Sequence, residues 1–200
     1  MAIESMAGRA NQKLRTRNAI VAAAADLSRT GREVTMSEVA KAALVSEATA
    51  YRYFPDLASL LTEAIAGQLP DAAEALASVT DCADPVARIA AATEFLLRHI
   101  LSRQGVVRAL IAATITRPGQ PQARPGLRFG LIDSALAPLD QTLGVTDPAA
   151  LSQLKRDLAV VVSAEALFSL TDACGLDPEE AIRSLVHTAT TLTRAACYRE

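Results

Sequence analysis

The sequence predicts an all-α protein of about nine helices. Half of the 200 residues are hydrophobic, which is enough for a packed core. Alanine is abundant, Trp is absent, and Phe and Tyr together number only seven, a composition that favours tightly packed helices. Apolar residues recur at helical spacing, and Asp-Pro pairs open two of the predicted helices. The length suits one compact unit or two small ones.

The first helix is predicted over residues 16–29. Ile20, Ala24 and Leu27 fall on one face of it, and Gly31 follows as a plausible C-terminal cap. Residues 1–12 are predicted to be a disordered basic tail.

Two short helices are predicted next. Thr35 and Glu38 have the spacing of a capping box, in which each side chain bonds to the other residue's backbone, so a helix is expected from Thr35 to about Ala42. After a tight turn, Ser46 is the expected N-cap of a second helix that continues to Phe54.

The helix after Ser46 has a composition that suits a DNA groove. Hydroxyl groups and a cation at this density can bond phosphates and reach base edges, although an ordinary helical hairpin is the alternative. Glu47 can accept from a cytosine amino group, alanine can touch a thymine methyl, and Arg52 can read guanine or hold a phosphate. Thr49, Tyr51 and Tyr53 are expected on the DNA backbone, with core packing as the alternative and Tyr51 as the more buried tyrosine. The predicted DNA-binding residues are Thr35, Ser46, Glu47, Ala48, Thr49, Ala50, Tyr51, Arg52 and Tyr53.

This segment resembles the DNA-binding motif of the TetR family of bacterial transcriptional regulators. The matching positions extend without a gap and are Val39-Ala40, Ala43, Val45-Ser46, Thr49, Tyr51 and Tyr53-Phe54. The resemblance covers about residues 16–65, a quarter of the chain, and beyond them is architectural only. Three positions depart from the pattern: Leu44 replaces the usual turn glycine, Ala48 replaces a frequent glycine, and Leu57 replaces a phosphate-binding lysine.

The resemblance implies a three-helix helix-turn-helix head over 13–56 and a helical effector-binding and dimerisation body over 57–200. It also implies that Thr35 meets a DNA phosphate, and that a small molecule bound in the body releases a repressor from a near-palindromic operator. The inner-facing ligand candidates are Phe95, His99, Phe129, Glu165 and Phe168, with packing as the alternative role of each. The scarcity of aromatic residues weakly favours a lipophilic effector.

The charge distribution agrees with a DNA-binding head. The chain has a net charge of −2, but the part through Phe54 contains eight Lys or Arg and five Asp or Glu residues. Arg9, Lys13, Arg15 and Arg17 form a small cationic cluster near the N-terminus. This cluster is either a solvated terminus or an arm that reaches phosphates or the minor groove.

The remaining chain predicts a helical body. Asp56 is the expected cap of a helix over 57–65, and further helices are expected over 85–103, 105–116 and 127–143, with a loop over 117–126. Asp147-Pro148 and Asp177-Pro178 open two long helices that reach about Cys174 and Tyr198.

These last two helices are apolar on more than one face, which predicts that a partner covers them. In the resembled family the last two helices form a dimeric four-helix bundle, so a homodimer is expected on both grounds. The predicted interface residues are Leu154, Leu158, Val161, Val162, Leu185, Ala189 and Leu192.

Several other functions are disfavoured by the sequence. Three widely spaced cysteines and two histidines fit neither a disulfide framework nor a zinc site, so no metal or cofactor is expected. The cysteines are interpreted as reduced thiols, with a redox sensor as the alternative. No apolar run reaches membrane-spanning length and no signal peptide is recognisable, so a cytoplasmic location is expected. An enzyme lacks converging catalytic groups, and the remaining alternative is a helical dimerisation module that has lost DNA binding.

Overall fold

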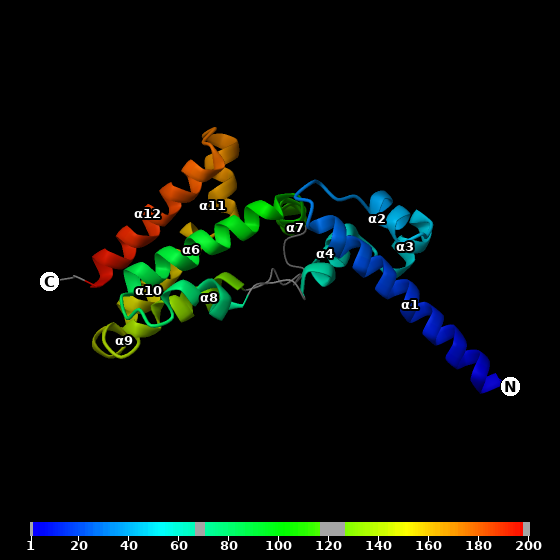
Figure 1. The fold of residues 1–200 in the computed structure, drawn as a ribbon, viewed down its shortest axis with the longest axis horizontal. Helices are drawn as coiled ribbons and strands as arrows, with labels where there is room; N and C mark the ends of the chain where they lie inside the picture. Colours follow the sequence, from blue (N-terminus) through cyan, green and yellow to red (C-terminus); the bar gives the residue numbers. More distant parts are fainter. Residues whose placement is uncertain (1, 67–70, 117–126, 198–200) are drawn as a thin grey trace. The chain divides into compact units, whose positions relative to one another are not determined.

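The computed structural model describes residues 2–66, 71–116 and 127–197. The side chains of residues 2–9, Thr114, Thr116, Leu127 and Phe129 lie outside this description. The described chain contains twelve α-helices, three short helical turns and no strand, so the all-α prediction is confirmed (Figure 1).

The chain divides into two compact units. One, here called the head, comprises residues 1–69 and 102–124; the other, the body, comprises residues 70–101 and 125–200. The predicted boundary after residue 56 therefore differs from the structural one. The cause is packing: Leu60 and Ile65, which follow that boundary, are buried in the head core, and so is Val106.

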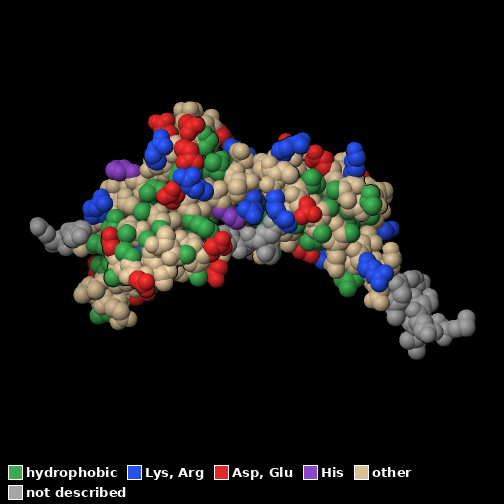
Figure 2. Space-filling view, in the orientation of Figure 1, with side chains coloured by type: hydrophobic (Ala, Val, Ile, Leu, Met, Phe, Trp, Pro, Cys, Tyr) green, Lys and Arg blue, Asp and Glu red, His purple; other side chains and the backbone are tan. Residues whose placement is uncertain are grey.

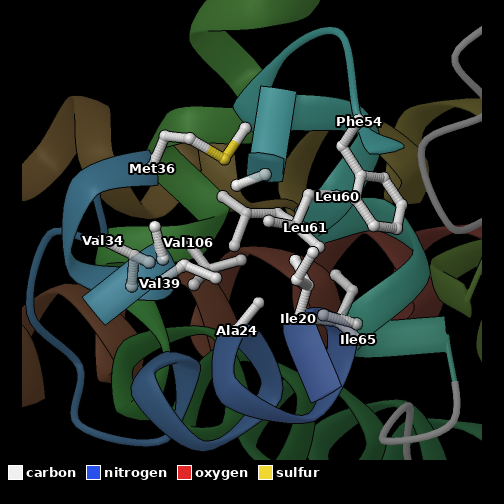
Figure 3. Close-up of a cluster of buried hydrophobic side chains, with 13 residues drawn as sticks. Ile20, Ala24, Val34, Met36, Val39, Phe54, Leu60, Leu61, Ile65 and Val106 are labelled. Carbon is white, nitrogen blue, oxygen red and sulfur yellow. The ribbon is translucent and has the colours of Figure 1, made fainter. Parts of the chain in front are cut away.

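The head is built from five helices around one apolar cluster. The cluster includes Ile20, Val39, Phe54, Leu61 and Val106, whose side chains converge in Figure 3. Four of them come from four different helices and Phe54 directly follows the fifth, so the cluster ties the head together although its two chain segments lie far apart in sequence. The helices are α1 (Ala2–Ser28), α2 (Met36–Ala42), α3 (Glu47–Tyr53), α4 (Leu57–Ala66) and α7 (Gln104–Thr116).

The first helix is longer than the sequence analysis predicted. Residues 2–12 are helical and continue directly into α1, which corrects the prediction of a disordered tail over 1–12. No proline interrupts the stretch between Ala2 and Ser28, and Ala, Met, Gln, Lys and Arg are good helix formers. These residues have no core partner nearby in sequence, so no apolar stripe at helical spacing marks them as a helix.

Arg17 braces α1 against the rest of the head. Its guanidinium donates two parallel hydrogen bonds to the Glu63 carboxylate of α4, one of them 2.5 Å long. The same guanidinium lies 5.0 Å from the ring centre of the buried Phe54. Arg17 therefore connects α1 to α4 and to the end of α3 through a forked ion pair and a cation–π contact.

The body contains the remaining helices. The Asp-Pro starts are confirmed: Asp147 accepts from the backbone N–H of Ala150 at 2.9 Å, and Asp177 accepts from that of Glu179 at 2.9 Å. The elements are α5 (Ala72–Ala75), η1 (Ala77–Val79), α6 (Pro85–Ser102), α8 (Leu127–Leu136), η2 (Ala137–Leu139), α9 (Leu143–Thr146), α10 (Pro148–Val161), α11 (Ala164–Phe168), η3 (Ser169–Ala173, a π-helical turn) and α12 (Pro178–Cys197).

Two predicted body helices are shorter than expected. The helix predicted over 127–143 ends at Leu136, and a 3₁₀ turn follows over Ala137–Leu139 with Pro138 as its second residue. The helix predicted to reach Cys174 stops after Val161, and Ser163 caps a new helix by accepting from the N–H of Ala166 at 3.1 Å. Both breaks have local causes, since proline and an N-capping serine favour helix ends. The predicted loop over 117–126 lies outside the described residues.

Arg88 of α6 joins several segments of the body. Its guanidinium donates to the carbonyl oxygens of Ser134 at 2.8 Å and Ala135 at 3.1 Å, near the end of α8. It also donates to the carbonyl oxygen of Val79 in η1, at 3.1 Å. A single cation thus satisfies terminal carbonyl groups that the α8 helix leaves unpaired.

Candidate nucleic-acid interface

The start of α2 is fixed by the predicted capping box. The backbone N–H of Glu38 donates to the Thr35 hydroxyl at 3.2 Å, and the N–H of Thr35 donates to the Glu38 carboxylate at 3.0 Å. The Thr35 hydroxyl also donates to that carboxylate at 3.0 Å. Thr35 is exposed, so its hydroxyl stays accessible while serving as the cap.

The turn between α2 and α3 passes through Leu44 in a left-handed conformation. Its φ is 57°, and the N–H groups of Leu44 and Val45 donate to Lys41 and Ala40 at 3.2 and 3.0 Å. These bonds form a Schellman motif, whose left-handed position glycine normally occupies. The Leu44 side chain is 93% exposed. The predicted tight turn therefore forms with Leu44 at the position where the family pattern has glycine.

Ser46 caps α3, as the sequence predicted. Its hydroxyl accepts from the N–H of Thr49 at 3.1 Å and lies 2.8 Å from the Thr49 hydroxyl. Two hydroxyl groups are thereby held together at the start of α3, where Ser46 is exposed and Thr49 half-buried.

The exposed face of α3 carries most of the predicted DNA-binding residues. Glu47, Ala48, Tyr51 and Arg52 are exposed. They share one solvent-facing surface because Ala50 and Phe54, one turn apart, anchor the opposite face of the helix in the head core.

Two predictions for α3 were wrong. Ala50 is 0% exposed and belongs to the core cluster, so it cannot touch a base. The predicted order of the tyrosines is also reversed: Tyr51 is 47% exposed, whereas Tyr53 is half-buried and packs against the core. Both errors follow from the register of the helix, which turns positions 50, 53 and 54 inward.

A hollow of ≈360 Å³ lies where the α1 extension passes the end of α3. Gln12 and Lys13 line it from α1, and Arg52 and Tyr53 line it from α3. The Arg52 guanidinium lies 5.7 Å from the Tyr53 ring centre. Sequence reasoning placed Lys13 in a cationic cluster but did not pair it with Arg52 and missed Gln12, because no local pattern connects these positions.

The charges on the head are interspersed. Figure 2 shows Lys and Arg side chains beside the grey N-terminal atoms, with Asp and Glu among the Lys and Arg groups elsewhere on the visible surface of the head. A DNA contact on this head would therefore use local cationic positions, because basic residues do not cover the visible face uniformly.

The predicted ligand residues lie on three helices of the body. Phe95 and His99 are half-buried on α6, and Phe168 is buried on α11. Glu165 of α11 accepts a hydrogen bond from Arg128 of α8 at 3.4 Å, an ion pair that sequence reasoning did not identify. The Phe129 side chain lies outside the described residues.

Most of the predicted dimer residues are buried within the single chain. Leu154, Leu158, Val162, Leu185 and Ala189 belong to the protomer core, which corrects their assignment to a dimer face. The reason is that α10 and α12 pack against each other and use these positions. Val161 and Leu192 are half-buried, and Val160 on α10 is 72% exposed.

Among the described residues, His, Cys, Asp and Glu side chains form no group of three or more that could hold a metal ion. Within the same ranges, no helix combines the length and hydrophobicity needed to cross a membrane.

The chain is similar to known bacterial regulators in sequence and in fold. Residues 19–64 match the family model described as bacterial regulatory proteins, tetR family. A similar solved structure is the crystal structure of a TetR transcriptional regulator from Rhodococcus sp. RHA1, with a TM-score of 0.50 and 23% sequence identity. The similarity covers 90% of this chain and 97% of that one and supports the fold. The comparison with curated proteins finds no match.

The matched segment runs from the middle of α1 through α4, and it includes the Thr35 cap, the Leu44 turn and the exposed face of α3. The chain therefore carries the DNA-binding motif of the tetR family model in its head, within an all-α fold similar to that of a TetR transcriptional regulator.

Proposed function

We propose that this protein is a repressor that binds a near-palindromic DNA operator as a homodimer and leaves it when a small molecule binds the body. The observation that carries the DNA-binding part is the two-faced character of α3. Ala50 and Phe54 are buried, whereas Glu47, Ala48, Tyr51 and Arg52 are exposed on a helix that Ser46 caps. A short helix fixed in this way can present its outer face to a major groove.

The residues proposed to contact DNA divide into two roles. Glu47 and Ala48 face base edges, where a carboxylate accepts from cytosine and a methyl group touches thymine. Thr35, Ser46, Thr49 and Tyr51 supply hydroxyl groups to backbone phosphates, which fix the register of the helix without reading sequence.

The first experiment measures binding to the DNA that flanks the protein's own coding region, by fluorescence anisotropy at two salt concentrations. Tight binding at one near-palindrome that weakens with salt is the expected result, because phosphate contacts release counterions. Weak binding that is equal for all sequences would contradict a specific operator at this location. Absence of any salt-dependent binding would favour a helical dimerisation module without DNA-binding activity.

A matched pair of variants tests the reading of bases. Glu47→Ala is expected to change which operator variants are preferred, whereas Glu33→Ala removes an equally exposed carboxylate of the head outside α3. The preference should remain unchanged in Glu33→Ala. Identical preferences in both variants would overturn the groove assignment of Glu47.

The effector part of the proposal rests on the body. Phe95 and His99 on α6, and Glu165 and Phe168 on α11, are the candidate contacts for this small molecule. Release of DNA requires that this molecule bind the released state more tightly than the DNA-bound state. A screen for compounds that lower the anisotropy of the bound operator tests this, and a Phe168→Ala variant should need a higher concentration of the active compound.

A further inference from the structure

We propose that the hollow between α1 and α3 is a clamp for one DNA backbone phosphate. The side chains of Lys13 and Arg52 supply the two positive charges that bind it. This inference rests on the proposed DNA-binding function and adds to it a second element, the N-terminal extension of α1. It also assigns Arg52 to the DNA backbone, whereas the sequence alone left base reading open.

The residues that line the hollow carry hydrogen-bond donors that an anion can use. Their four side chains are an amide, an ammonium, a guanidinium and a phenol, and all four can donate hydrogen bonds. None of the four is acidic. A phosphate is favoured over a cationic ligand because ammonium and guanidinium groups both pair with its oxygens.

The hollow also has a suitable size. Its volume is ≈360 Å³, and a water molecule in the liquid occupies about 30 Å³. A phosphodiester group with several bridging waters can therefore enter it. Water-bridged phosphate contacts are common at protein–DNA interfaces.

The walls of the hollow are held by the core of the head. Tyr53 is half-buried against the core, and the Arg52 guanidinium lies 5.7 Å from its ring centre, which keeps Arg52 at the rim. Lys13 lies one helical turn before Arg17 and hence on the same face of α1. Arg17 is bound to Glu63 and lies over Phe54, so this brace fixes the separation between α1 and the end of α3.

The position of the hollow fits a DNA contact. It adjoins the exposed face of α3, since Arg52 belongs to both. A duplex that receives α3 in its major groove brings a phosphate to the end of this helix. Leu57 lacks the charge to bind that phosphate, whereas Lys13 and Arg52 can bind it together.

The test compares Lys13→Ala with Arg15→Ala on the operator found as described above. Arg15 is an equally exposed cation on the same helix, about 200° around the axis from Lys13, and it does not line the hollow. Lys13→Ala should weaken binding to operator and unrelated DNA by the same factor, roughly tenfold, and should lower the salt slope by about one. Arg15→Ala should lose less than about threefold, because it removes only distant attraction. Circular dichroism should show the same folding for both variants, since both side chains are exposed.

A second measurement identifies the phosphate itself. A set of operators is used in which each carries one neutral methylphosphonate in place of a different phosphate. One position should weaken binding of the unmodified protein and of Arg15→Ala strongly but have a smaller effect on Lys13→Ala, because the variant has already lost one of the two cations that bind this phosphate. Lys13→Arg should restore the sensitivity.

The outcomes separate the two proposals. If the unmodified protein shows no salt-dependent DNA binding, the proposed function fails and the clamp fails with it. If it binds specifically but Lys13→Ala and Arg15→Ala behave alike, and no methylphosphonate has a smaller effect on Lys13→Ala than on the unmodified protein, the clamp alone is overturned.

Discussion

The backbone of Gly105 packs directly against the backbone of Arg32. A β-carbon added at Gly105 would lie 1.9 Å from the Arg32 carbonyl oxygen, and the Gly105 N–H donates to the Gly31 carbonyl at 3.3 Å. The start of α7 is thereby joined to the loop that leads into α2, and only glycine fits at this position.

Gly105→Ala is expected to lower the free energy of unfolding by about 2–4 kcal/mol, because the added methyl group must displace backbone. Urea denaturation measures the change. The matched control is Gly130→Ala on α8, where a β-carbon meets nothing within 4 Å and alanine should be neutral or stabilising. An unchanged midpoint in Gly105→Ala would show that the loop moves away without cost. DNA affinity should fall with stability in Gly105→Ala, since the displaced loop carries the α2 cap.

Leu44→Gly is expected to stabilise the head. Leu44 has a φ of 57° and a side chain that is 93% exposed, so glycine relieves backbone strain and loses little packing. The gain should be about 0.5–1 kcal/mol after the entropy cost of glycine in the unfolded chain. Leu44→Ala keeps the β-carbon and should bring no such gain. Denaturation midpoints measured in parallel would contradict the strain argument if the alanine variant were as stable as the glycine variant.

The ion pair between Arg17 and Glu63 is expected to contribute a modest coupling. Both side chains are about two-fifths exposed, so solvent screens the attraction, although the forked geometry is favourable. A double-mutant cycle with Arg17→Ala and Glu63→Ala should give a coupling free energy of about 1 kcal/mol. Arg17→Ala should cost more than Glu63→Ala, because it also removes the contact with Phe54. Equal costs of the two single variants would show that the cation–π contact contributes nothing.

The parts of the fold that sequence predicts well are those determined within a few residues. The capping box of Thr35 and Glu38 and the Asp147 cap depend on neighbours three residues away, and all three residues act as predicted. The burial of Ala50 was missed although a signal exists: it lies one turn before Phe54, on the same face of α3. Alanine is small and only weakly hydrophobic, so the helical periodicity of apolar residues does not mark it as buried.

Features that depend on distant packing were not predictable in the same way. An apolar face on α10 or α12 looks the same in sequence whether its own chain or a second copy covers it. The structure buries Leu158 and Ala189 by packing α10 against α12, and only this tertiary contact removes them from a dimer face. The hollow beside Arg52 likewise depends on α1 and α3 meeting across the head.

The proposed homodimer is expected to use the outer face of α10. Val160 is 72% exposed there, beside the half-buried Val161, so both are apolar positions of α10 that a partner can cover. Val160→Asp should convert the dimer to a monomer, as measured by light scattering. Val145→Asp is the matched control, because Val145 is 70% exposed but lies on α9. A Val160→Asp protein that stayed dimeric would place the contact on another face.

The three cysteines should differ in reactivity toward a thiol reagent. Burial, and secondly the negative charge of Asp84, raise the pKa of the Cys197 thiol above its usual value. A raised pKa lowers the thiolate fraction at neutral pH, and the thiolate is the reactive form. Cys197 should therefore react more slowly at neutral pH than the exposed Cys174, and its rate should rise as the pH is increased. Single-cysteine variants measured from pH 7 to pH 10 test this order.

The variant Asp84→Asn keeps an oxygen that can cap α6. It should raise the reaction rate of Cys197 in part, since burial remains, and should leave the rate of Cys174 unchanged. Equal rates at Cys174 and Cys197, or no response of Cys197 to Asp84→Asn, would contradict this account of its environment.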